Sequence, residues 1–175
     1  MRALAVALIA LGVPGLAACG SSGGAPSPTI KPGLDACVVG TWKSTGAHGT
    51  VTSSDGTLHI PLSGGAGQLT VIRRDGTATI TYDGAQPLRG VGTDGSTYMV
   101  SASGQIAGTV RTGGGQVTLD VANPDNATQT ISKDGAVLQT THAPPELVSP
   151  YTCTAHTAFD VTTNGITVTM VPVAT

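Results

Sequence analysis

Apolar and polar residues alternate with a period of two over much of the chain. In segment 77–82, for example, threonines alternate with alanine, isoleucine and tyrosine. Strict alternation is typical of β-strands that bury one face and expose the other. The same pattern predicts strands in further segments, namely 39–44, 58–62, 69–71, 98–103, 106–110, 117–121, 159–161 and 166–170, and a hairpin whose strands flank 133–135.

Short turn signals separate these segments. The strongest is Asn164-Gly165, because this pair suits the positive backbone angles of a two-residue hairpin turn. Further turns are predicted at 75–76, 104, 113–115, 123–126 and 134–135. About nine or ten strands joined by short hairpins are expected at this spacing. The predicted fold is all-β, an antiparallel meander that forms a β-barrel of about 8–10 strands, with a sandwich as the alternative.

Composition agrees with an all-β fold. Glycine, threonine and valine are abundant, whereas the chain has a single glutamate, and no window after the N-terminal segment shows a helical stripe. Only 10% of residues are charged, and the formal net charge is −2. The chain has no stripe of basic residues that could bind the phosphate backbone of a nucleic acid. No nucleic-acid partner is therefore expected.

The N-terminus carries an export pattern. Arg2 precedes an apolar stretch over 3–15, which is too short to span a membrane as a helix. The sequence Leu16-Ala17-Ala18-Cys19 then resembles the lipobox of bacterial lipoproteins. The resemblance implies that residues 1–18 are a signal peptide and that Cys19 becomes the acylated first mature residue, with palmitate among its acyl chains. The alternative is an ordinary secretory signal followed by a chance cysteine.

The lipoprotein pattern implies a location and a domain plan. Two acyl chains give stable anchoring, so the protein is expected on the extracytoplasmic face of the cell membrane. Segment 20–33 has the Gly, Ser and Pro composition of a flexible linker. With the acylated cysteine it forms 19–33, and the β-domain is expected over 34–175.

Two cysteines remain once Cys19 is set aside. Cys37 and Cys153 form an even pair in an exported chain, which favours a disulfide; two free buried thiols are the alternative. A bridge over so long a loop contributes about 4–5 kcal/mol in the chain-entropy model. Neither cysteine belongs to a CxxC motif, so redox catalysis and zinc binding are not indicated.

Gly40-Thr41-Trp42 opens the predicted domain. This Gly-x-Trp sequence resembles the signature of lipocalins and fatty-acid-binding proteins, the calycins, and the segment around Cys153 looks like the end of small actinobacterial lipoproteins. The resemblance implies an up-and-down barrel in which the tryptophan closes one end against a basic residue of a late strand. This chain departs from the pattern, because Lys133 is its last basic residue. Alternatively, Trp42 is a core residue of an unrelated sandwich.

Catalytic and metal motifs are weak. Segment 90–95 matches GxGxxG, but a predicted strand follows it where a dinucleotide site needs a helix. No GxSxG nucleophile elbow is present. Five of the nine aspartates precede glycine and are explained as turn residues. The four histidines lack metal-ligand spacing and are expected at the surface or with satisfied hydrogen bonds, although two of them lie in predicted strands and could point inward: His48 and His156, and in the strands His59 and His142. The protein is therefore not expected to be an enzyme, and no cofactor or metal is predicted.

Two functions remain. The first is binding of an apolar small molecule or lipid inside the barrel, against the aromatic residues of the inward apolar sets: Trp42, Tyr82, Tyr98 and Phe159. The second is an envelope structural or protein-interaction lipoprotein whose barrel or sandwich is packed and free of ligand. An apolar cavity of at least about 300 Å³ would favour the carrier, whereas an interior filled by these aromatics would favour the interaction protein. The sequence names no protein partner.

Overall fold

The computed structural model describes residues 30–54, 56–155 and 157–174. Within them, twelve strands form one antiparallel sheet, so the all-β prediction is confirmed. The helical residues are two short 3-10 turns, η1 (Ala36–Val38) and η2 (Pro124–Asn126). The strands are β1 (Gly40–Thr52), β2 (His59–Gly64), β3 (Leu69–Ile72), β4 (Thr77–Thr81), β5 (Leu88–Val91), β6 (Thr97–Gly113), β7 (Gln116–Val121), β8 (Ala127–Lys133), β9 (Ala136–His142), β10 (Glu146–Thr154), β11 (Ala158–Thr163) and β12 (Ile166–Pro172).

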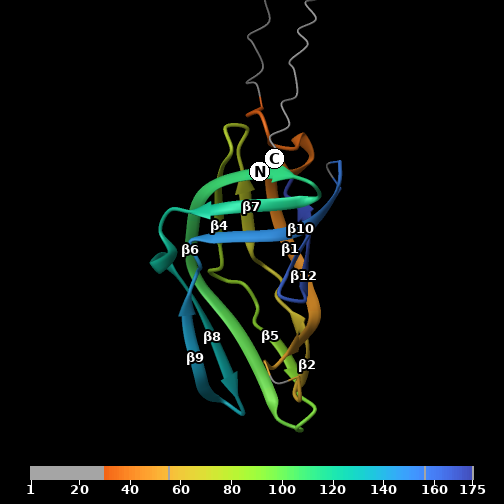
Figure 1. Cartoon of the computed structure of the whole chain (residues 1–175), viewed down its shortest axis with the longest axis vertical. Helices are drawn as coiled ribbons and strands as arrows, with labels where there is room; N and C mark the ends of the chain where they lie inside the picture. The colour runs from red at the N-terminus through yellow and green to blue at the C-terminus, as the bar shows by residue number, and fades with distance from the viewer. Residues whose placement is uncertain (1–29, 55, 156, 175) are drawn as a thin grey trace, which may run out of the picture.

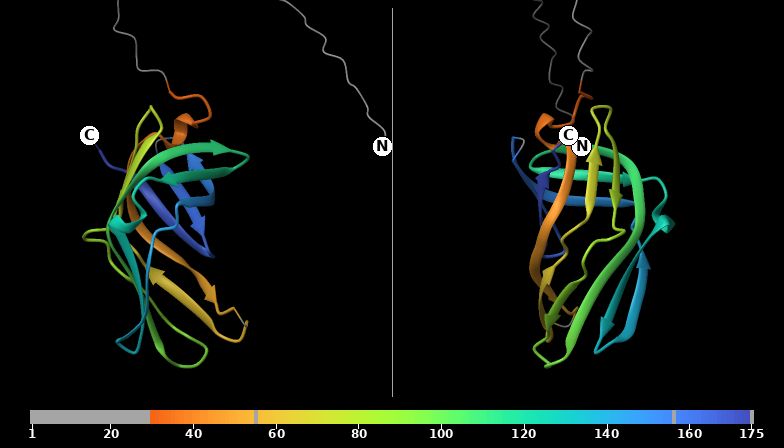
Figure 2. Two further views of the ribbon diagram at one scale, coloured as in Figure 1. Left: turned by 60° about the vertical axis from the view of Figure 1, so that its left-hand side comes forward. Right: turned by 180° about the vertical axis from the view of Figure 1, so that it is seen from behind.

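Eight of the strands form a closed circuit of hydrogen-bonded neighbours. The circuit runs from β1 through β3, β4, β6, β7, β10, β11 and β12, and β12 pairs again with β1. In Figure 1, the paired strands β7 and β10 run side by side across the upper part of the molecule. The first described residues lie at the same end. The remaining strands, β2, β5, β8 and β9, extend the sheet toward the lower end, as both views of Figure 2 show.

The two long strands β1 and β6 connect these regions. One side of β1 pairs with β3 near its start and with β2 near its end. In the same way, β6 pairs first with β5 and β8 and later with β4 and β7. Each long strand can serve different neighbours at its two ends because it is longer than any one of them.

This arrangement corrects two predictions. The sheet has twelve strands rather than about 8–10, and β5 and β10 were not among the segments predicted as strands. Simple meander connectivity is also wrong: among the described strands, β2–β3, β4–β5, β7–β8 and β9–β10 are consecutive but unpaired. The long strands cause both departures, since hairpins added at either end separate strands that follow one another in the chain.

Gly104 is not a turn residue. It lies inside the continuous strand β6, with φ of +86°. A Cβ at this position would overlap the backbone oxygen of Asn126, so a glycine is needed for the close approach of the two segments. The predicted turn was wrong because the positive φ bends the strand instead of reversing it.

The hairpin predicted at 75–76 is confirmed, since β3 pairs with β4, and so are two predicted hairpins with two-residue turns. Asn164 and Gly165 join β11 to β12 with φ of 50° and 79°, and Asp134 and Gly135 join β8 to β9 with φ of 49° and 86°. Positive φ at both central residues is the requirement of a type I′ turn, and its twist matches that of the flanking strands.

Buried apolar side chains form two clusters. The larger cluster lies within the eight-strand circuit and includes Trp42, Ile106 and Phe159. The smaller one is formed by Ile60, Leu62 and Tyr98, toward the lower end. The expected disulfide is confirmed, since Cys37 is bonded to Cys153 and so ties η1 to β10.

Candidate functional site

The predicted site residues Trp42 and Phe159 lie together in the larger cluster. Trp42 on β1 is 1% exposed, and its indole Nε1 donates a hydrogen bond of 2.9 Å to the carbonyl of Val38. The Phe159 ring packs against it with centroids 5.4 Å apart, and the Tyr151 ring stands 6.0 Å from Phe159 on another side. The tryptophan therefore packs against an aromatic ring inclined by 55°, where the calycin resemblance implied a basic side chain.

The N-terminal segment closes this end of the cluster. Leu34 and Val38 are buried in it, and the Thr112 amide donates to the carbonyl of Gly33 at 2.8 Å. The Asp35 carboxylate accepts a hydrogen bond of 3.0 Å from the Tyr151 hydroxyl. Residues just before β1 thus cover the aromatic rings from the upper end.

Tyr82 and Tyr98 occupy different surroundings. Tyr82 follows β4, is partly buried and packs against the larger cluster, and this burial raises the pKa of its phenol. Tyr98 on β6 is 4% exposed and belongs to the smaller cluster. The structure brings Trp42, Tyr82 and Phe159 to one cluster and places Tyr98 in the other, so the four do not form one site.

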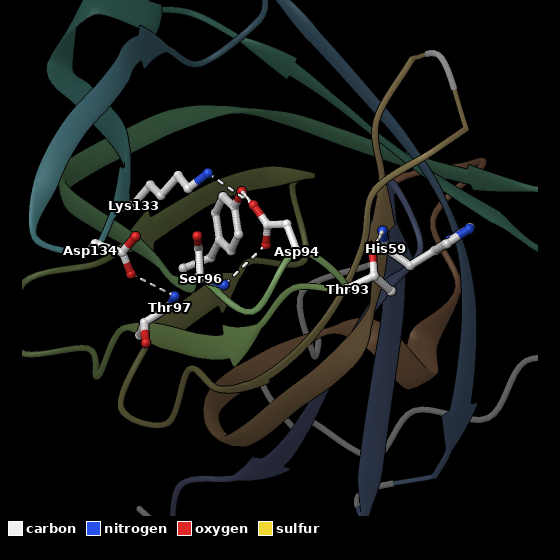
Figure 3. Close-up of polar contacts among 8 residues, drawn as sticks. His59, Thr93, Asp94, Ser96, Thr97, Lys133 and Asp134 are labelled. Carbon is white, nitrogen blue, oxygen red and sulfur yellow. Dashed lines mark hydrogen bonds and ion pairs between the residues drawn. The ribbon is translucent and has the colours of Figure 1, made fainter.

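Tyr98 takes part in a polar cluster at the lower end (Figure 3). Its hydroxyl donates to Asp94 Oδ2 at 2.9 Å, and the Lys133 ammonium lies 2.9 Å from the same oxygen. Lys133 Nζ also lies 5.7 Å from the centroid of the Tyr98 ring. The amide of Ser96 donates to the other carboxylate oxygen at 3.1 Å. We call Asp94, Tyr98 and Lys133 the lower-end cluster.

Hydrogen bonds around the lower-end cluster join two turns and the start of one strand. The Thr97 amide donates to Asp134 Oδ1 at 2.8 Å, and the Asp134 amide donates to the carbonyl of Thr97 at 2.8 Å. On the other side, the Thr93 amide donates to the carbonyl of His59 at 3.0 Å. The β5–β6 turn is thereby fixed to the β8–β9 turn and to the start of β2, as Figure 3 shows.

The charge states of the lower-end cluster are stable around neutral pH. The Lys133 ammonium, followed by the Ser96 amide, lowers the pKa of the Asp94 carboxyl. Desolvation, followed by the hydrogen bond to Asp94, raises the pKa of Tyr98. The bond to Asp94 raises the pKa of Lys133. Each of these pKa values is shifted further from 7, whereas a general acid or base works best when its pKa lies near the operating pH. The geometry suits a structural tie between loops.

Two open hollows lie on the surface of the described residues. One of about 450 Å³ lies beside β1, near the register shift of β1 on β12 between Ser44 and Gly46, and is lined partly by His48, Ala66 and Gln86. The other, of about 430 Å³, lies over β4, β6 and β7 and includes Arg73 and Asp120 in its lining. Both are open to solvent, so neither is the enclosed apolar cavity that the carrier hypothesis requires.

The histidines within the described ranges are at the surface, as expected. His48, His59 and His142 are all exposed, and His59 Nδ1 lies 3.1 Å from the Thr52 hydroxyl oxygen. His156 and Cys19 lie outside the described residues. In the part of the chain that the structure describes, no group of three or more His, Cys, Asp or Glu residues is arranged to hold a metal ion.

Comparison with protein-family models, with curated proteins and with solved structures finds no match to this chain. Among the described residues, no helix has the length and apolar character needed to cross a membrane. The class of protein that can be stated is thus an all-β antiparallel domain with one internal disulfide.

Proposed function

We propose that this protein is a lipid-anchored envelope lipoprotein that works through contacts of its outer surface with another protein. Its domain is a packed, calycin-like β-barrel, and Cys19 anchors it to the extracytoplasmic face of the cell membrane. The eight-strand circuit of pairing supports the barrel. The lipobox-like segment 16–19 supports the anchor.

The filled interior carries this proposal. The largest side chains with less than 2% exposure are Trp42, Phe159, Ile106 and Val38, and all four belong to the larger cluster. Protein interiors are packed as densely as organic crystals, so a ligand needs space that these side chains already occupy. Their packing favours a domain that is closed to ligands at this end and presents its outside to a partner.

Carriage of an apolar molecule is the second candidate, and one observation favours it. Around Tyr98, several apolar side chains of the smaller cluster are only partly buried: Val51, Leu58, Leu88, Val100 and Ile166. A lipid-like ligand would gain most by covering this partly exposed apolar area. The carrier hypothesis therefore locates its ligand beside Tyr98 rather than between Trp42 and Phe159.

Native mass spectrometry of the full chain purified from its own membrane separates the two candidates. The interaction protein is expected to show the mass of the acylated chain alone, and its melting temperature should not respond to a panel of lipids. A bound apolar molecule would overturn the proposal if the Val100→Arg variant lost it. Val91→Arg is the matched control, because Val91 is 57% exposed and the added charge stays in water.

A further inference from the structure

Strand β9 has a free edge. It pairs with β8 alone, whereas each of the other eleven described strands has at least two neighbours. In an antiparallel strand, alternate residues direct their N–H and C=O groups away from a given neighbour. The outer side of β9 therefore carries unpaired backbone donors and acceptors, which are a template for another strand.

The usual protection of an edge strand is largely missing. Natural proteins cover free edges or place lysine and proline on them. Segment Ala136–His142 contains no Lys, Arg, Asp, Glu or Pro, and six of its seven residues are exposed. Val137 and Leu138, at 65% and 57% exposed, are among the most exposed large apolar residues of the described chain.

One irregularity limits the usable length of the edge. The register of β9 on β8 shifts between Ile131 and Ser132, and Leu138 has no partner there. After this bulge the pairing is regular from Gln139 to His142. An added strand is thus expected to pair along 139–142 and to contact Val137 or Leu138 at its end.

A second copy of the chain does not suit this edge in the membrane. Strand β9 runs close to the long axis, and the first described residues lie at the upper end (Figure 1). Antiparallel pairing of two β9 strands would invert one copy relative to the other. Two copies anchored through Cys19 in one membrane could pair in this way only if the linker turned one domain back toward the bilayer, so a second copy is the less favoured occupant.

We infer that β9 is a strand-addition site for an extended, uncharged segment of a different envelope protein. The inference rests on the proposed interaction function and gives it a location. When a strand is added to a sheet edge, backbone hydrogen bonds supply the affinity and side-chain contacts supply the specificity. Since β9 has no Lys, Arg, Asp or Glu, the partner segment gains nothing from charged side chains and instead covers Val137 and Leu138.

Photocrosslinking in intact cells tests this site. A photoreactive amino acid replaces Thr140 in the full, anchored chain, and a second variant carries it in place of exposed Arg89 on β5, a strand with two neighbours. From Thr140 we expect one heteromeric product whose crosslinked partner peptide is an extended, uncharged segment. In a Val137→Lys/Leu138→Lys background its yield should fall about tenfold, the effect of about 1.4 kcal/mol. The matched control Val91→Lys should leave the yield unchanged.

The possible outcomes distinguish the inference from the proposed function. Heteromeric products from Arg89 but none from Thr140 would overturn the β9 site and leave the interaction function standing. No product from either position would count against both. A product made of two copies of this chain, or a yield that the two lysines do not change, would also overturn the inference. Melting curves of the lysine variants should match the parent, because both side chains are exposed.

Discussion

Each buried aromatic side chain with a polar atom has a hydrogen-bond partner suited to that atom. The Trp42 indole donates to a backbone carbonyl, and the Tyr98 hydroxyl donates to the Asp94 carboxylate. Burying such a group without a partner costs free energy, so these bonds determine where each ring can be placed. Phe159 has no polar atom, and it fills the space against Trp42 without this constraint.

Phe159→Ala should therefore be strongly destabilising. Phe159 is 2% exposed and contacts two aromatic rings, so truncation leaves a cavity in the larger cluster. Large-to-small core substitutions of this kind cost about 3–5 kcal/mol. Urea unfolding of both proteins measures the loss. Val148→Ala, at a position 48% exposed, is the control and should stay within about 0.5 kcal/mol. Equal stability of the two variants would contradict the packed interior.

Asp94 should make stability depend on acid pH. Its pKa is lowered in the folded protein, chiefly by Lys133, so its contribution is complete above the unfolded pKa of about 4 and is lost as the pH falls further. The difference in free energy of unfolding between the parent and Asp94→Asn should be largest near neutral pH and shrink below about pH 4. Urea unfolding at several pH values measures it.

The control for this prediction is Val148→Ala, at a position 48% exposed. Its stability difference from the parent should not change with pH, because the substitution neither adds nor removes a titratable group. A pH-independent difference for Asp94→Asn would show that the carboxylate is not held in its charged form by Lys133.

At the scale of elements, local chemistry could be predicted and pairing between distant segments could not. The turns at Asp134-Gly135 and Asn164-Gly165 depend on two adjacent residues, and the structure has both. Gly104 gives the same local signal, but its positive φ serves a close approach to Asn126, a contact that the sequence does not reveal. Strand partners depend on the lengths of β1 and β6, which alternation alone does not define.

In the candidate site, too, burial could be predicted from the sequence but contacts between distant residues could not. Alternation correctly placed Tyr98 and Phe159 on buried faces, and Trp42, which the Gly-x-Trp resemblance singled out, is buried as well. It could not show that Tyr98 belongs to a separate cluster, because one face of a curved sheet continues past the end of the core. The pairing of Asp94 with Lys133, 39 positions apart, had no signal either, since both residues lie beside turn sequences that explain them locally.

The disulfide connects elements that are far apart in the chain. Cys37 beside β1 and Cys153 on β10 are separated by 116 positions. Closing a loop of this length stabilises the fold by about 4–5 kcal/mol in the chain-entropy model. The double variant Cys37→Ser/Cys153→Ser should lose about 2–5 kcal/mol in urea unfolding. Adding reductant should lower the parent to a similar stability and leave the variant unchanged; an unaffected parent would contradict the bridge.

At the scale of the whole molecule, the two ends differ. The upper end holds the disulfide, the N-terminal cover and the start of the described chain (Figure 2). The lower end holds the lower-end cluster and the β8–β9 hairpin. If Cys19 anchors the chain, the linker joins the membrane to the upper end, and the lower end is presented away from the bilayer. The free edge of β9 then lies where a partner can approach it.

Cys19→Ser should release the protein from the membrane. The apolar stretch over 3–15 is too short to anchor the chain as a helix, so under the proposed function membrane retention depends on the acyl chains expected on Cys19. Without that thiol there is no site for acylation, and the exported domain should move to the soluble fraction. Cell fractionation followed by immunoblotting measures this change. Cys37→Ser is the matched control, because it removes a thiol of the disulfide and leaves Cys19 in place, so that variant should stay with the membrane. If Cys19→Ser remained in the membrane fraction as fully as Cys37→Ser, the anchor would be wrong, and the outward orientation of β9 would lose its basis.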